Sequence, residues 1–121
     1  AMGIDAVITS PGSVDMYSPK VVRATAGSLW HVPLYSGITL ATVSAQFPQL
    51  NKLALSAKGN TSLTDLKELG NFIAIFGNEA RGIDTLLDGE VIQVHIPMKG
   101  NAESLNLSAA ASIVMFYLAA L

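Results

Sequence analysis

The sequence contains no cysteine in its 121 residues, which excludes a disulfide framework and thiolate metal sites. Charge is also scarce, because 13% of the residues are Asp, Glu, Lys or Arg and the formal net charge is −2. Such a charge gives no electrostatic support for binding a phosphate backbone with this segment alone. Any contact with nucleic acid must therefore depend on other regions or on a second subunit.

Long apolar runs are absent as well. The most apolar stretch, residues 109–121, has 13 residues, whereas a membrane-spanning helix needs about 20. We interpret it as a buried helix, see no secretory signal, and expect a cytoplasmic protein without a membrane partner. Half of the residues are hydrophobic and the mean hydropathy is +0.45, which is enough for one core and leaves apolar surface for a partner.

Short apolar runs alternate with segments of helical pattern. We expect strands over residues 5–9, 30–36, 52–57, 72–77 and 91–96, and helices over 19–27, 39–47, 64–69 and 104–121. Pro19 suits a first helical position, Thr64 a helix cap, and Pro33 an edge or irregular strand. The alternation predicts a single α/β domain with a mostly parallel sheet flanked by helices.

Two of the predicted strands run directly into segments rich in glycine and polar residues: FIAIFGNEARGI at 72–83 and VIQVHIPMKGNAESLNLS at 91–108. Such segments at the carboxyl ends of parallel strands are typical of places where backbone amides meet a ligand. The first segment could also be an ordinary strand exit, in which glycine supplies a positive φ and Glu79 stabilises a helix start.

The second segment carries the stronger signal. Pro97 removes a backbone donor where the strand ends, and Ser104, Asn106 and Ser108 then crowd the start of a long apolar helix. Free N–H groups at a helix start can hold an oxygen-rich ligand. A plain cap at Ser104 is the structural alternative, but a cap needs only one such residue. The two segments together predict a cofactor site.

Three stretches carry a resemblance to a known family: SPGSVDMYSPKVVRATAGSLWHVPL at 10–34, FGNEARGI at 76–83 and IPMKGNAESLNLSAAASI at 96–113. On these residues the sequence resembles the SpoU (TrmH) branch of the SPOUT superfamily, which comprises RNA 2′-O-ribose methyltransferases. The resemblance runs over essentially the whole chain. It implies a SPOUT-type fold with a carboxyl-terminal trefoil knot, and a homodimer formed through the knot region and the final helix.

The same resemblance implies a chemistry. A methyl group would pass from S-adenosyl-L-methionine to a ribose 2′-hydroxyl of structured rRNA or tRNA, without a metal. By matching motif positions, the cofactor contacts would be Gly77, Ile96, Met98 and Leu105, largely through the backbone, with Ser56 and Ala57 as additions. The catalytic residues would be Glu79, Ser104 and Asn106, and Arg23 could contact an RNA phosphate.

One family motif has no counterpart here. The family's first motif is an Asn-x-Gly segment followed by an arginine on the first helix, and this sequence starts at Ala1 where that helix should end. We therefore expect residues 1–121 to be a catalytic domain lacking its amino-terminal strand and helix, with impaired activity or none alone. Two alternatives stay open: a noncatalytic RNA-binding or assembly module, and a nucleotide-binding domain in which GNEARG cradles a phosphate.

Three further side chains could take part in chemistry by residue type. His31 and His95 could act as general bases, and Trp30 could stack on a base. Their apolar neighbours favour packing or interface roles for the histidines, and core or interface for Trp30.

Overall fold

A computed structural model describes residues 2–77 and 90–121. The predicted catalytic residue Glu79 and most of the FGNEARGI motif therefore lie outside the described residues. The chain divides into two compact units, Ala1–Pro48 and Gln49–Leu121.

The first unit contains a two-stranded parallel sheet and short helices. Strand β1 (Val7–Thr9) pairs with β2 (Leu34–Ser36), and α1 (Pro19–Ala24), η1 (Ser28–Trp30) and α2 (Leu40–Gln46) complete the unit. Pro19 does begin α1, and the Ser18 hydroxyl accepts from the Val21 N–H to cap it. The helix is shorter than predicted, because the chain leaves the helical conformation at Ala26, whose φ is 47°, and continues through Gly27 at a φ of 87° before η1.

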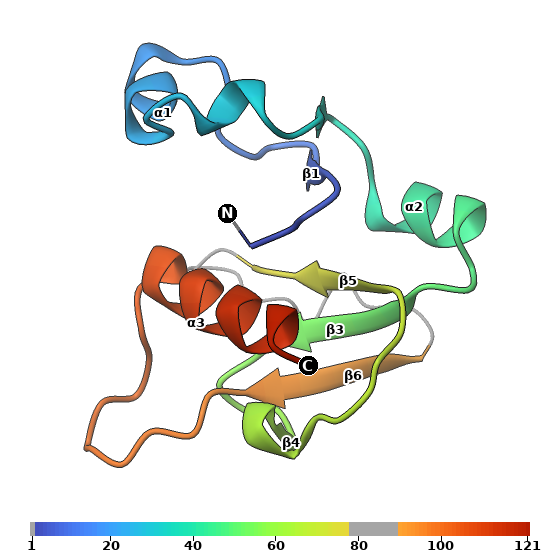
Figure 1. Ribbon diagram of the computed structural model, residues 1–121, viewed down its shortest axis with the longest axis vertical. Helices are drawn as coiled ribbons and strands as arrows, with labels where there is room; N and C mark the ends of the chain where they lie inside the picture. Colours follow the sequence, from blue (N-terminus) through green and yellow to red (C-terminus); the bar gives the residue numbers. More distant parts are fainter. Residues whose placement is uncertain (1, 78–89) are drawn as a thin grey trace. The chain divides into compact units, whose positions relative to one another are not determined.

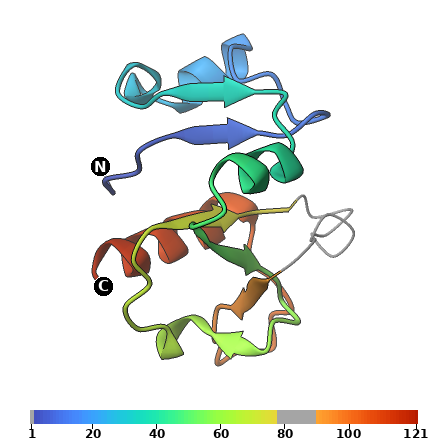
Figure 2. The same ribbon diagram turned by 90° about the vertical axis from the view of Figure 1, so that its right-hand side faces the viewer.

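The second unit is built on a four-stranded sheet. Its strands are β3 (Asn51–Leu55), β4 (Thr61–Ser62), β5 (Phe72–Ile75) and β6 (Val91–His95), in the order β4-β6-β3-β5 (Figure 2). Each strand pairing in the described parts of the chain is parallel. The predicted α/β class with a mostly parallel sheet is confirmed.

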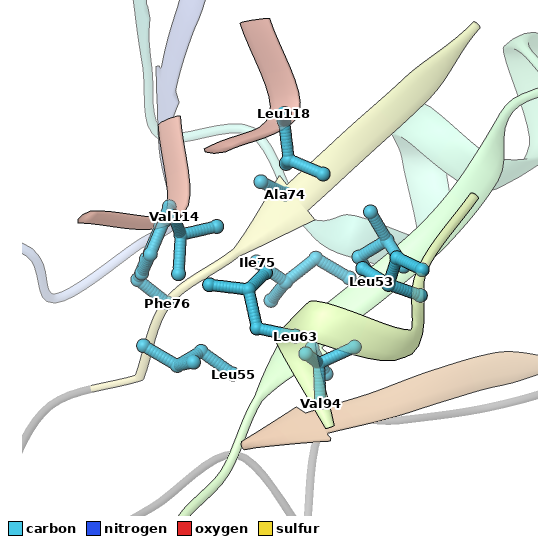
Figure 3. A pocket seen from close by; sticks show the side chains of 11 residues that line it. Leu53, Leu55, Leu63, Ala74, Ile75, Phe76, Val94, Val114 and Leu118 are labelled. Carbon is cyan, nitrogen blue, oxygen red and sulfur yellow. The ribbon is translucent and has the colours of Figure 1, made fainter. Parts of the chain in front are cut away.

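One face of this sheet carries the core under helix α3 (Leu107–Ala119; Figure 1). Leu53 pairs with Ala74 of β5 and with Ile92 of β6, so these side chains share a face. The buried cluster there consists of Leu53, Leu63, Leu66, Val94, Val114 and Leu118. These side chains are among those that line a small cavity (Figure 3). Its volume is about 10 Å³, so it is a packing gap about the size of one water.

The helix predicted over residues 64–69 is wrong. A single 3-10 turn, η2 (Leu63–Asp65), is followed by Leu66 in an extended conformation, and the turn is capped by Ser62 instead of Thr64. The Tyr117 hydroxyl of α3 donates to the carbonyls of Thr64 at 3.1 Å and Leu66 at 3.2 Å. Leu66 is buried in the core, so tertiary packing of an extended segment overrides the local helical pattern.

Residues 56–60 form a crossover from β3 to β4 that passes strand β6, because β6 lies between those two strands. Gly59 lies against the backbone of β6: a Cβ at this position would be 2.7 Å from the Gln93 carbonyl oxygen and 2.8 Å from the Val94 carbonyl carbon. Only glycine leaves room for so close an approach of two backbones.

Two further expectations concern membrane-spanning helices and the trefoil knot. No helix in residues 2–77 or 90–121 has the length and apolar character needed to cross a bilayer. The carboxyl-terminal trefoil knot stays a prediction, since residues 78–89 belong to the path between β5 and β6 and are outside the described residues.

The close approach at Gly59 generates a stability prediction. Gly59→Ala should lower the free energy of unfolding by about 1–3 kcal/mol, because the added methyl meets backbone that cannot move aside. Urea denaturation followed by circular dichroism measures the change. Gly100→Ala is the matched control, since a Cβ at Gly100 meets nothing within 4 Å. Equal stabilities of the two variants would contradict the tight crossing.

Candidate functional site

The carboxyl ends of three adjacent strands lie level in the second unit. Ala54 pairs with Ile75 of β5, and Leu55 pairs with Val94 of β6. Because all three strands are parallel, the residues that follow them leave the sheet at the same edge. This register brings segments 56–57, 76–77 and 96–98 to one edge, and these segments contain the predicted cofactor residues Ser56, Ala57, Gly77, Ile96 and Met98.

These residues offer mainly backbone groups and small side chains at the edge. The Ile96 side chain packs against the core cluster, so its backbone is the part that a ligand could contact. Ala57 is exposed, and Met98 is 38% exposed. Ser56 is half-buried; its N–H donates to the Val94 carbonyl at 2.9 Å, and its hydroxyl accepts from the Lys58 N–H at 3.3 Å.

Helix α3 begins on the side of the sheet where the strands end (Figure 1). Its N-cap is Asn106, whose Oδ1 accepts from the Ala109 N–H at 2.8 Å. The alternative of a plain cap at Ser104 is therefore wrong, because the capping residue is Asn106. Ser104 and Leu105 are exposed in the segment just before the helix. With Oδ1 engaged, the Asn106 amide nitrogen is the part that can donate to a ligand.

Residues 1–116 match a family described as the SpoU rRNA Methylase family. The chain belongs to this family. It is 31% identical over 120 residues to the 23S rRNA (guanosine(2553)-2′-O)-methyltransferase RlmP of Bacillus subtilis, which covers 98% of this chain and 48% of that protein.

Solved structures agree with this membership of the SpoU family. The SpoU methyltransferase AviRb from Streptomyces viridochromogenes, in complex with AdoMet, superposes with a TM-score of 0.85 at 25% identity, over 98% of this chain and 50% of that one. An AdoMet-bound rRNA methyltransferase from Sinorhizobium meliloti gives a TM-score of 0.82 at 27% identity, over 96% and 46%. The SpoU chain described here thus spans about half the length of these relatives.

The remaining candidate functional residues belong to segments other than those that follow β3, β5 and β6. Arg23 is exposed on α1 of the first unit, and its role toward RNA stays a prediction. Trp30 is 83% exposed, so the expectation of a core position is wrong for the described chain. No three potential metal ligands converge in the ranges 2–77 and 90–121.

Two features of this SpoU chain escaped the sequence reasoning. Gly59 lies against β6, and His95 Nδ1 is 2.9 Å from the Gly59 carbonyl oxygen. The Gly-Asn pair at 59–60 is a recognisable turn signal. Nothing in the sequence, however, indicates which strand that turn would cross.

The cap at the start of α3 should contribute to the stability of the chain without any ligand. Asn106→Ala should destabilise the SpoU chain by about 1 kcal/mol, because the Ala109 N–H loses its acceptor. Asn106→Asp keeps an oxygen at the same position and should unfold at nearly the same urea concentration as the parent chain. If both variants lose stability equally, the side-chain oxygen is not the stabilising group.

Proposed function

We propose that this chain forms the donor-binding part of an S-adenosyl-L-methionine-dependent methyltransferase that acts on a ribose 2′-hydroxyl of rRNA or tRNA. The observation that supports the proposal most directly is the level carboxyl edge of β3, β5 and β6. Family membership over residues 1–116 and the AdoMet complexes of related proteins support it further.

The groups at this edge suit a nucleoside ligand. Backbone N–H and C=O groups at Gly77, Ile96 and Met98 can pair with the donors and acceptors of adenine and ribose edges. Ser56 and Ala57 contribute from the neighbouring strand, and Leu105 from the segment before α3. The Ile96 side chain is held in the core, so its backbone is fixed before a ligand arrives and little ordering cost is added on binding.

The reaction itself requires little covalent help from the protein. The bond between the methyl carbon and the sulfonium sulfur breaks as the carbon joins the ribose oxygen. The sulfur keeps the bonding electron pair and leaves as S-adenosylhomocysteine, and the hydroxyl proton passes to water. The sulfonium already activates the methyl group, so positioning donor and acceptor is the main task. We assign this task to the Asn106 amide and the Ser104 hydroxyl, together with Glu79.

RNA binding and location complete the proposal. The net charge of −2 is unsuited to binding a phosphate backbone alone, so we propose that Arg23 acts with further regions of the whole protein or with a second subunit. The substrate would be structured RNA in the cytoplasm.

Calorimetry with the donor tests the proposal. S-adenosylmethionine and S-adenosylhomocysteine should both give saturable heats with this chain, whereas ATP should give none. A preference for ATP would support a nucleotide-binding domain instead. Absence of donor binding together with retained affinity for rRNA would support a noncatalytic RNA-binding or assembly module.

A homodimer through α3 is the second part of the proposal. The helix buries Ala110, Val114 and Leu118 against its own sheet. On its outer face Ile113 and Phe116, three residues apart, are 41% and 65% exposed. Exposed apolar side chains of this kind are typical of surfaces that a partner covers. We propose that a second copy of the chain covers the outer face of α3.

Light scattering after size-exclusion chromatography measures the assembly. The parent chain should elute as a dimer, and Phe116→Lys should yield a monomer, because a charge would be buried without a partner. Tyr17→Lys is the matched control, since Tyr17 is an aromatic residue of the first unit with a similar exposure of 60%. A monomeric parent chain, or a dimer that survives Phe116→Lys, would contradict this interface.

A further inference from the structure

The crossover, residues 56–60, is a hydrogen-bonded turn organised around Ser56. The Gly59 N–H donates to the Ser56 carbonyl at 3.0 Å, and the Lys58 N–H donates to the Ser56 hydroxyl at 3.3 Å. Ser56 is also a proposed contact of the methyl donor. The conformation of the crossover therefore decides where this contact lies.

Hydrophobic burial cannot hold the crossover in place. Its sequence, Ser-Ala-Lys-Gly-Asn, contains no large apolar side chain, and Ala57, Lys58 and Asn60 are exposed. A segment of this composition gains little from leaving water. Its position must therefore depend on hydrogen bonds and on backbone contact with the neighbouring strand.

His95, the last residue of β6, makes one of these hydrogen bonds. Val94 is buried in the core and Ile96 packs against it, so the alternation of a strand turns the His95 side chain to the other face of the sheet. There Nδ1 lies 2.9 Å from the Gly59 carbonyl oxygen. A carbonyl only accepts, so Nδ1 carries the proton and donates.

Gly59 is the residue of the crossover that both touches the β6 backbone and accepts the hydrogen bond from His95. The Gln93–Val94 peptide limits how far Gly59 can approach β6, and the His95 ring prevents it from moving away. A loop that is restrained in both directions is ordered before a ligand binds. The entropy of ordering it then does not weaken the binding.

We propose that His95 is a positioning residue for the methyl donor, which it serves by holding the crossover where Ser56 and Ala57 meet the donor. The inference rests on the proposed function, since it takes the edge of β3, β5 and β6 as the donor site. His95 acts through Gly59 and does not itself touch the donor.

A pair of variants of equal shape tests this role. His95→Asn places an amide N–H where Nδ1 lies, whereas His95→Leu has the same branching and no donor. We expect S-adenosylhomocysteine to bind His95→Leu about threefold to tenfold more weakly than the parent chain, the effect of losing one ordinary hydrogen bond. His95→Asn should bind within about twofold of the parent chain, since the bond is restored.

Hydrogen exchange without any ligand provides an independent readout. The amides of Lys58 and Gly59 should exchange faster in His95→Leu than in His95→Asn, because the crossover is released. A purely structural role would lower the unfolding temperature and leave the affinity for S-adenosylhomocysteine unchanged. Should His95→Leu not fold, His95→Asp replaces it, because Asp has the shape of Asn and lacks the N–H.

The outcomes separate this inference from the proposed function. If the parent chain gives no heat with S-adenosylhomocysteine, the proposed function fails and the role of His95 fails with it. If the parent chain binds and His95→Leu binds equally well, only the role of His95 is overturned. The role of His95 is supported if the variant with an N–H at residue 95 binds S-adenosylhomocysteine more tightly than the variant without one, and if its amides at residues 58 and 59 also exchange more slowly.

Discussion

The parallel pairing of β3 with β5 on one side and β6 on the other is the constraint on which the rest of the second unit depends. Its register places Leu53 beside Ala74 and Ile92, and Leu53 and Ala74 join the core that packs against α3. The same register makes the three strands end level. A slip of one residue would turn Leu53 out of the core and move Ser56 to another height, so core and candidate site are fixed together.

Ile96 and Asn106 each use one group for the fold and leave another group for a ligand. Ile96 places its side chain in the core and leaves its backbone at the edge. Asn106 does the converse within one side chain, because its oxygen caps α3 while its amide nitrogen can donate elsewhere. In both residues, the contact with the rest of the protein fixes the position of the group that can bind a ligand. The site is therefore ordered before the ligand arrives.

Much of this arrangement can be predicted from the sequence, because its strands are short apolar runs. The five predicted runs overlap β1, β2, β3, β5 and β6, with bounds that differ by a few residues. The helix predicted over 64–69 fails because Leu66 reaches the core from an extended chain and Tyr117 hydrogen-bonds the carbonyls of that segment. The cap expected at Ser104 lies at Asn106, because serine and asparagine two residues apart are equally good capping residues. Contacts between distant segments, such as Gly59 with Gln93, leave no trace in local pattern.

The position of β6 between β3 and β4 has a consequence for the order of folding. A ribosome releases β3, the crossover and β4 before it has made residues 91–95, yet the two-residue β4 pairs with β6. β4 thus stays without this neighbour until β6 is synthesised and enters the gap beside β3. Closure of the sheet must wait for contacts between residues far apart in the chain, which is the situation in which small proteins fold slowly.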